Sequence, residues 1–516
     1  MERGRNMRTD DAKTGERAAM LDANACYAAF RAHDARFDGR FFIGIASTGI
    51  YCRPVCRVRM PKAENCSYHV SAAAAEAAGF RPCLKCRPEL APGQSLMDAR
   101  ERLVRKAASI IEEDSPDEDG IDGLAEALGV SGRHLRRVFS VEYGVSPVRF
   151  AQTCRLLLAK SLLTDTGLPV TNVAFASGFG SLRRFNDLFK RHYRMTPTDL
   201  RRSGGNPGGK EKDAITLRLG YRPPYRWDRI AGFLADRAVS GVESAGPDFY
   251  RRTVAVRDGN ATLRGWISVV NEAKRNALAV TVSSSLLPVL PKVLGRVKAL
   301  FDLNAEPLEI YEKLSVMNAH TSGLFTPGLR VPGCFDPFEM AVRAVLGQQI
   351  TLRAARTLAA RLASAFGDSI ATPFGELTHV FPAPGRICAL ETPIGDRLGP
   401  LGITGIRARA ISALAGALVE GSIALDRTSD PQTTMTRLLA LPGFGPWTVQ
   451  YIAMRVLGWP DAFPHTDYGV KTALGGLSPE RILELSENWR PWRSYATIGL
   501  WASLNRPAGG EGEDRS

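Results

Sequence analysis

Two pairs of closely spaced cysteines are the first residues of this chain whose types and spacing indicate chemistry. Cys52-Arg-Pro-Val-Cys56 and Cys83-Leu-Lys-Cys86 supply four thiols, a set that surrounds one tetrahedral Zn²⁺. Zinc holds a cysteine sulfur as the thiolate, which is its nucleophilic form. A redox pair at Cys83 and Cys86, or unrelated core cysteines, are the alternatives. We predict one zinc ion bound by Cys52, Cys56, Cys83 and Cys86, with Cys66 packed outside the closed ligand shell.

A glycine-rich hairpin followed by a carboxylate forms a second candidate site. The stretch LLALPGFGPWTVQYIAMRVL at 438–457 places Pro-Gly-Phe-Gly between two helical segments. Gly443 and Gly445 let backbone amides approach a DNA phosphate closely, and the following helix presents the positive end of its dipole. A purely structural hairpin is the alternative. Asp467 lies 22 residues after Gly445 in FPHTDYGVK, where a helix N-cap role is compatible with a catalytic one.

Two basic segments show the pattern of helix-turn-helix units. IDGLAEALGVSGRHLRRVFS at 121–140 has apolar residues at core spacing, Gly129 at the turn and Ser131 as a cap. A second copy spans 170–192, with Gly178 at its turn. An all-α bundle with a charged face is the alternative. The cationic positions expected to face outward are Arg133, His134, Arg136, Arg137, Arg183, Arg184, Lys190 and Arg191.

Length and charge agree with a multidomain protein that binds DNA. The 516 residues are too many for one core, and the formal charge of +14 suits a polyanionic partner. No stretch reaches the roughly 18 apolar residues of a membrane span, and the N-terminus has no apolar signal region. We expect a cytoplasmic, nucleoid-associated protein with no membrane partner. In a reducing compartment, paired cysteines favour metal over disulfide.

Residues 41–89 resemble the N-terminal domain of the Ada family of bacterial adaptive-response regulators. Their sequence is FFIGIASTGIYCRPVCRVRMPKAENCSYHVSAAAAEAAGFRPCLKCRPE. The resemblance implies that Cys52 accepts methyl groups from DNA methylphosphotriesters and that Cys56, Cys83 and Cys86 are its co-ligands. Four thiolates around Zn²⁺ carry a formal charge of about −2, and methylation removes one negative charge. We therefore expect DNA binding to tighten after methylation, which salt-matched binding curves of the two forms test.

The paired helix-turn-helix units, with the tail MTPTDLR at 195–201, resemble the AraC-type DNA-binding domain. In that family each second helix enters the major groove of double-stranded DNA, one helical turn apart. The resemblance implies transcriptional regulation, with promoter DNA and RNA polymerase as partners.

Three segments resemble the AlkA family, 3-methyladenine DNA glycosylase II. They are YRPPYRWDRIAGFLADRAVSGVE, LRVPGCFDPFEMAVRAVLGQQIT and WRPWRSYATIGLWASL. The resemblance covers about 213–505 and implies that the damaged nucleotide is flipped out of the duplex. It makes Asp467 the catalytic carboxylate and Gln349 the side chain that fills the gap left by the flipped base. It also implies an aromatic pocket, whose members are otherwise ordinary core residues: Trp447, Tyr451 and Trp501.

Departures from related families narrow the expected chemistry. Trp447 stands where glycosylase/lyases have a lysine, so we expect monofunctional hydrolysis. No cysteine follows Cys388, so we expect no iron-sulfur cluster. Thr466 replaces the second acid of the better-known AlkA pattern, and His465 precedes it with an open role. A Pro-Cys-His-Arg motif is absent, so repair of O6-alkylguanine is not expected.

We predict a multidomain, mainly α fold with α+β parts. Its domains are a small zinc-binding α/β domain at 20–92, a double helix-turn-helix at 98–203, a β-rich glycosylase subdomain at 213–325 and an α-helical helix-hairpin-helix core at 326–505. Glycine- and proline-rich linkers are expected at 87–97 and 203–212, and a disordered tail at 506–516.

The predicted function is DNA alkylation sensing and repair in one polypeptide. Methyl transfer to Cys52, regulation of transcription and hydrolytic excision of bases such as 3-methyladenine are its three activities. One alternative is a transcription factor whose glycosylase-like half is a catalytically silent DNA-binding appendage. Another is a repair enzyme whose middle domains merely tether it to DNA.

Overall fold

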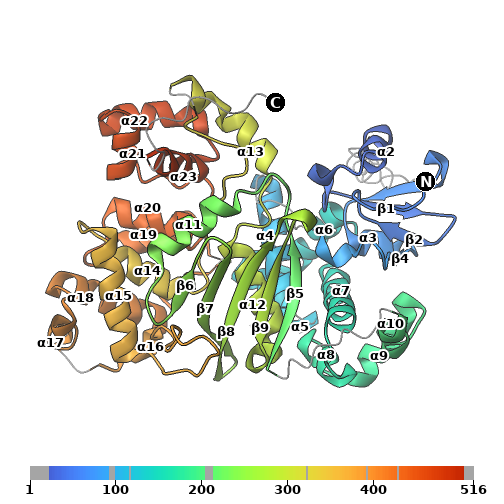
Figure 1. The fold of residues 1–516 in the computed structure, drawn as a ribbon, viewed down its shortest axis with the longest axis horizontal. Helices are drawn as coiled ribbons and strands as arrows, with labels where there is room; N and C mark the ends of the chain where they lie inside the picture. The colour runs from blue at the N-terminus through green and yellow to red at the C-terminus, as the bar shows by residue number, and fades with distance from the viewer. Residues whose placement is uncertain are drawn as a thin grey trace, which may run out of the picture.

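The computed structural model describes residues 22–91, 99–114, 118–203, 213–320, 323–390, 393–426 and 429–504. Residues 92–97 of the first predicted linker and 204–212 of the second lie outside the described residues, as does the predicted tail. The predicted fold class is confirmed, since two sheets are embedded in a mainly helical chain (Figure 1).

In the described residues, the N-terminal region is a small four-stranded sheet with two α-helices. The strand order is β3-β1-β2-β4, and only β2 and β4 pair in parallel. Their register opposes Tyr51 to Pro82, which places Cys52 beside Cys83 at the ends of adjacent strands. The elements are α2 (Ala23–Arg31), β1 (Phe42–Ile45), β2 (Ile50–Cys52), β3 (Cys66–His69), α3 (Ala72–Ala77) and β4 (Arg81–Pro82).

Seven helices follow and contain both predicted helix-turn-helix units. Gly129 and Gly178 have positive φ angles of 71° and 85° at the two turns, a conformation that favours glycine. Ser131 and Ser181 cap the two second helices by accepting from backbone amides. The helices are α4 (Ala99–Asp114), α5 (Glu118–Ala127), α6 (Gly132–Tyr143), α7 (Pro147–Asp165), α8 (Val170–Ala176), α9 (Leu182–Tyr193) and α10 (Pro197–Ser203).

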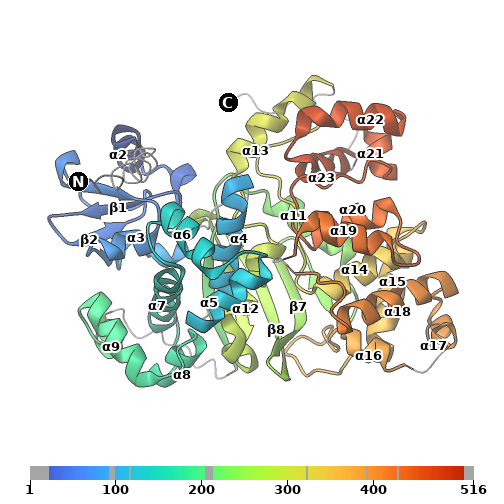
Figure 2. The ribbon, with the colours of Figure 1, turned by 180° about the vertical axis from the view of Figure 1, so that it is seen from behind.

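A five-stranded antiparallel sheet, in the order β5-β9-β8-β7-β6, forms the centre of the molecule. Buried residues alternate along β5 and β9, as expected for a sheet with one face on a core. Seen from behind, α12 covers this sheet and α4 packs against α12 (Figure 2). The elements are β5 (Ala214–Gly220), α11 (Trp227–Arg237), β6 (Glu243–Ala245), β7 (Phe249–Asp258), β8 (Ala261–Glu272), β9 (Ala277–Ser283), α12 (Leu290–Leu300) and α13 (Pro307–Leu314).

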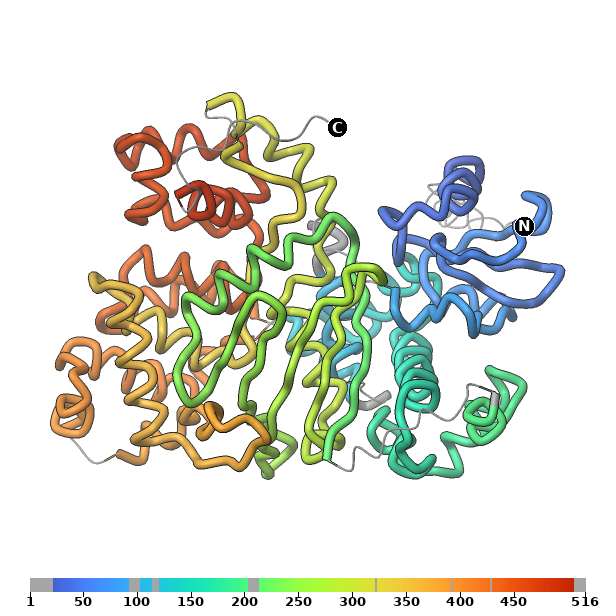
Figure 3. Tube along the Cα trace, in the orientation of Figure 1, coloured from blue at the N-terminus to red at the C-terminus, as the bar shows by residue number. Residues whose placement is uncertain are grey.

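The C-terminal region is helical and wraps the far edge of the sheet, in the yellow to red part of Figure 3. Its helices are α14 (Pro337–Leu346), α15 (Leu352–Phe366), α16 (Pro384–Cys388), α17 (Ile394–Leu398), α18 (Gly405–Val419), α19 (Pro431–Leu439), α20 (Pro446–Arg455), α21 (Tyr468–Ala473), α22 (Pro479–Ser486) and α23 (Arg493–Leu504). Among the described helices none alone has the length and apolarity of a membrane span, although the bent pair Ile394–Leu401 and Gly405–Val419 passes that test when combined.

The second helix-turn-helix unit shares its apolar core with the central sheet. Buried side chains of α7, α8 and α9 belong to the same cluster as those of β5, β8, β9 and α12. α7 contacts β5, and α8 contacts the 3-10 turn η5 (Ser284–Val289) that follows β9. The two halves of the chain are therefore packed into one body rather than suspended on a linker.

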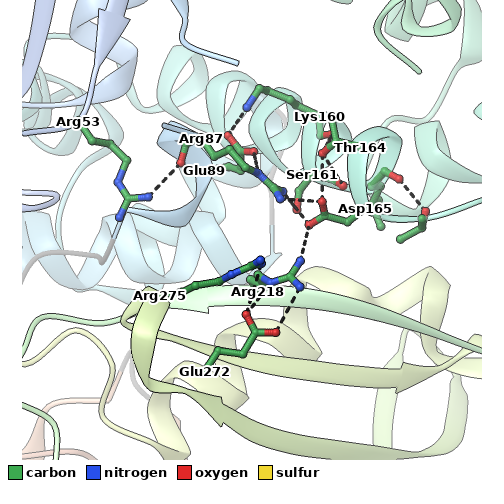
Figure 4. A network of polar contacts seen from close by, with 12 residues as sticks. Arg53, Arg87, Glu89, Lys160, Ser161, Thr164, Asp165, Arg218, Glu272 and Arg275 are labelled. Carbon is green, nitrogen blue, oxygen red and sulfur yellow. Dashed lines mark hydrogen bonds and ion pairs between the residues drawn. The ribbon is translucent and has the colours of Figure 1, made fainter. Parts of the chain in front are cut away.

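A chain of ion pairs joins the cysteine-rich region, α7 and the sheet (Figure 4). Arg87 directly follows Cys86 and donates two hydrogen bonds to Asp165, at 2.6 and 2.7 Å. An Asp165 oxygen lies 4.0 Å from Arg218 of β5, whose guanidinium pairs with Glu272 of β8 at 2.8 Å. Charged contacts thus connect Arg87, the residue after a candidate metal ligand, with the central sheet.

Buried Glu89 makes this junction sensitive to acid. Burial raises its pKa, but Lys160, at 2.6 Å, and Arg87 lower it by more, so the net pKa lies below the ordinary value. A depressed folded-state pKa stabilises the fold above the unfolded pKa, about 4.3, and that stability is lost as pH falls through the folded pKa. We expect the urea midpoint to fall below about pH 4.5. Glu89→Gln should remove this acid-dependent part; an unchanged pH profile would contradict the assignment.

Candidate metal centre and base-excision site

Four cysteine sulfurs converge at the ends of the two parallel strands. The sulfurs of Cys52, Cys56, Cys83 and Cys86 all lie within 4.8 Å of one another. A tetrahedral zinc site with Zn–S bonds of about 2.3 Å requires sulfurs about 3.8 Å apart, so this donor set fits the ion. Cys66 is outside the group, as predicted, and its thiol contacts the carbonyl of Lys62 instead.

The clustered thiols are close enough to share hydrogen bonds with one another. The pKa of Cys52 is raised because its thiol shares hydrogen bonds with Cys56, Cys83 and Cys86, and burial adds to the effect. Backbone amides help to hold the cluster, since Arg53 N–H donates to the sulfur of Cys86 at 3.4 Å. All nine cysteines are free thiols. The geometry therefore supports a metal site rather than a disulfide.

In the C-terminal half, Asp467 is held by two tryptophans. Trp447 Nε1 donates to Oδ2 and Trp501 Nε1 donates to Oδ1, each at 2.8 Å. Oδ1 also accepts from the backbone N–H of Val470 at 3.1 Å, because Asp467 is the N-cap of α21. The cap and the candidate catalytic role thus coexist. Gly469 is required here, since a Cβ at that position would lie 2.9 Å from the Trp501 ring.

The predicted pocket residues lie together beside this carboxylate. Trp447 and Tyr451 stack with ring centroids 5.3 Å apart, and Tyr451 and Trp501 are 6.3 Å apart. Phe233 of α11 extends the group, stacked 6.2 Å from Trp501. The structure therefore brings the predicted aromatic set and Asp467 into one site and adds a ring from the β-rich subdomain.

Two arginines beside the aromatic group, buried Arg455 and half-buried Arg237, were not expected from the sequence. Arg455 is 2% exposed, and its Nη1 donates to the Tyr451 hydroxyl at 2.8 Å. Arg237 lies over the Phe233 ring at 3.7 Å. The contact of Arg455 could have been predicted from the sequence, because a cation four residues after Tyr451 on a helix lies on the same face as the tyrosine. Phe233 and Arg237 had no such signal, because only tertiary packing brings α11 to this place.

Gln349 and the hairpin are joined through the adjacent glutamine. Gln349 is exposed and has a positive φ of 53°, so its side chain projects from a strained turn. Gln348 donates to the Gly443 carbonyl at 2.8 Å and to Thr448 Oγ1 at 2.9 Å. The turn is thereby fixed to the hairpin. In the described residues, no side-chain hydrogen bond links His465 to Asp467.

The two hairpin glycines differ, which gives a paired test. Gly443 has φ of +82°, and a Cβ there would lie 2.9 Å from Ala410 Cβ, whereas Gly445 has φ of −94° and open space. We expect Gly443→Ala to cost about 1–3 kcal/mol of stability. Gly445→Ala should unfold like wild type but bind duplex DNA more weakly, because its methyl occupies the approach of a phosphate. Melting and DNA titration measure both; equal destabilisation would refute the distinction.

The predicted DNA-facing arginines are not equivalent. Arg133, Arg137, Arg183 and Arg184 are exposed. Arg136 is half-buried and pairs with Asp122 at 2.9 Å, so it also ties the two helices of the first unit together.

Comparison with known proteins agrees with this arrangement. Residues 25–89 match the metal binding domain of Ada, 124–203 match a helix-turn-helix domain, and 216–336 match the AlkA N-terminal domain. A probable bifunctional transcriptional activator/DNA repair enzyme AlkA from Mycobacterium tuberculosis is 38% identical over 496 residues, covering 94% of this chain and 97% of the relative. The chain belongs to this family.

Other similar proteins match only one part of the chain. DNA-3-methyladenine glycosylase 2 of Escherichia coli is 37% identical over 285 residues, covering 55% of this chain and 95% of the relative. The bifunctional transcriptional activator/DNA repair enzyme Ada of the same species is 31% identical over 191 residues, covering 37% and 52%. A 3-methyladenine DNA glycosylase structure from Archaeoglobus fulgidus, 20% identical, covers 55% of this chain and 97% of its own with a TM-score of 0.45. The predicted fusion of Ada-type and AlkA-type parts and the single Zn²⁺ site are confirmed.

Proposed function

We propose that this member of the family senses DNA alkylation at Cys52 and excises alkylated bases at Asp467. The observation that carries the proposal is the carboxylate held by two indoles within an aromatic group, next to a hairpin suited to a DNA phosphate. A silent appendage would have no need to orient a carboxylate by three donors.

At the excision site the hydrogen bonds orient the carboxylate of Asp467. Oδ1 accepts from Trp501 and from the Val470 N–H, and Oδ2 accepts from Trp447 alone, so a lone pair of Oδ2 remains for the sugar. As the bond between C1′ and the base breaks, the carboxylate stabilises the oxocarbenium-like sugar or activates the attacking water. The flipped base stacks on the aromatic group, and exposed Gln349 fills the gap in the duplex.

At the metal centre Cys52 is proposed as the methyl acceptor. Zinc, when bound, holds the sulfurs as thiolates at neutral pH. Cys52 Sγ then attacks the methyl carbon of a phosphotriester, the C–O bond breaks, and the electron pair stays on the phosphate oxygen. Because Cys52 is 1% exposed, we propose that the turn from Arg53 to Cys56 moves aside when DNA binds.

The finer partners and boundaries are also proposals. Exposed Arg133, Arg137, Arg183 and Arg184 would contact promoter DNA, with Arg136 combining a contact and its pair to Asp122. RNA polymerase would be the protein partner, and binding to chromosomal DNA would make the protein nucleoid-associated. The proposed domains remain 20–92, 98–203, 213–325 and 326–505.

One incubation tests both activities of the full chain. Purified protein is mixed with methylated duplex DNA, and the free bases and the mass of the Cys52 peptide are measured together. We expect released 3-methyladenine and one added methyl group. Methylation without base release would favour a regulator with a silent appendage. A promoter reporter that responds to neither protein nor methylating agent would favour a tethered repair enzyme.

A further inference from the structure

The hydroxyl of Tyr451 receives a hydrogen bond, but its own hydrogen has no acceptor among the residues that the structure describes. Arg455 Nη1 donates to it at 2.8 Å, and the same guanidinium donates to the carbonyls of Pro332 and Gly333. A guanidinium has no acceptor atom, and it is the sole hydrogen-bond partner of this hydroxyl among the described residues. Tyr451 is half-buried, and polar hydrogens away from bulk water normally find a partner. Here a base that enters the aromatic group can supply one.

Positive charge surrounds this hydroxyl. Arg455 and Arg237 lie over the Phe233 ring at 4.9 and 3.7 Å. Burial raises the pKa of Tyr451, but Arg455, Arg237 and Arg343 lower it by more, so the net pKa is below its ordinary value. The tyrosine is therefore a strengthened hydrogen-bond donor. The same guanidiniums disfavour a cation beside them and favour a base that gains negative charge.

Damaged bases differ in the charge that they carry when they leave the sugar. When the glycosidic bond breaks, its electron pair passes to the base. A base made cationic by alkylation leaves as a neutral molecule. A neutral base, such as hypoxanthine, leaves as an anion and gains most from a hydrogen bond that strengthens as the charge develops.

We propose that Tyr451 donates a hydrogen bond to the flipped base and so selectively promotes release of neutral damaged bases, with Arg455 as the positioning residue for the hydroxyl. The O–H bond stays intact in this step. Water supplies hydroxide to C1′ and a proton to the departing base, so atoms and charge balance. The inference rests on the proposed glycosylase function and concerns its substrate class.

Single-turnover excision of two bases by one preparation tests the inference. Duplex with hypoxanthine is the neutral probe, and methylated duplex that releases 7-methylguanine is the cationic probe. We expect Tyr451→Phe, which keeps the ring, to slow hypoxanthine release about 30-fold, the range for a hydrogen bond to a charged group. Release of 7-methylguanine should slow only about threefold, as expected for a neutral leaving group.

Tyr495→Phe is the matched control, because its hydroxyl donates to Asp302 at 2.7 Å in the same half of the chain, away from the aromatic group. It should leave the ratio of the hypoxanthine release rate to the 7-methylguanine release rate unchanged. Arg455→Met should lower the ratio and Arg455→Lys should restore part of it. The ratio is independent of the folded fraction, so instability alone does not move it.

Equal slowing of both bases in Tyr451→Phe would overturn the inference, as would a wild-type protein that releases 7-methylguanine but no hypoxanthine. An unchanged ratio in Arg455→Met would overturn the positioning role of Arg455. A wild-type protein that releases neither base would instead contradict the proposed function.

Discussion

Asp467→Asn is expected to slow base release by about 10³-fold while binding to undamaged duplex DNA is retained, because a charge that stabilises the transition state is lost. Asparagine still caps α21, so the fold should persist. It has only one acceptor oxygen for the two indoles of Trp447 and Trp501, which both donate to the wild-type carboxylate. The loss should therefore combine charge and orientation. Single-turnover excision measures the rate, and a DNA titration measures the affinity.

Asp396→Asn is a suitable control because Asp396 is exposed on α17. It removes one negative charge from the same half of the chain and should excise bases like wild type. Full activity of Asp467→Asn would remove Asp467 from the mechanism. Loss of DNA binding in the same variant would point to a damaged fold instead of lost catalysis.

Cys83→Ala is expected to reduce the bound zinc from one ion per chain to nearly none and to abolish methylation of Cys52. Structural zinc contributes about 10–16 kcal/mol to small folded sites, and Cys83 supplies one of only four clustered sulfurs. Metal analysis and peptide mass spectrometry measure the two losses. Base release should continue, because Asp467 and its tryptophans belong to the other half of the chain.

Cys66→Ala is the matched control, since Cys66 lies outside the metal-binding cluster and its thiol donates a hydrogen bond to the Lys62 carbonyl. It should keep its zinc and accept methyl groups. Full zinc content in Cys83→Ala would contradict the four-sulfur site. Zinc loss in Cys66→Ala would show that the ligand set is wrong.

Local spacing predicted the metal centre and the turns. The four clustered cysteines, Gly129 and Gly178 were all readable because ligand spacing and glycine turns are short-range features. The aromatic set and Asp467 were readable only through family resemblance, since residues 447, 467 and 501 carry no common local pattern.

Long-range packing hid the rest of the site. Phe233 and Arg237 come from α11, more than two hundred residues before Asp467 in the sequence. The need for glycine at position 469 becomes clear only from the Trp501 ring, which packs where a side chain would otherwise lie. Likewise, nothing local joins Arg87 to Asp165, because the contact depends on how α7 packs against the cysteine-rich region. These relations follow from tertiary structure alone.

The apolar cluster common to α7–α9 and the sheet limits where the chain can be cut into two fragments that each fold alone. A fragment ending at residue 203 would lose the contacts of α7 with β5 and of α8 with η5, and so would uncover part of that cluster. A fragment beginning at residue 213 would bare the matching surface near β5. Each product would tend to aggregate, so polypeptides expressed separately are expected to need the opposite half, added in trans, to remain in solution.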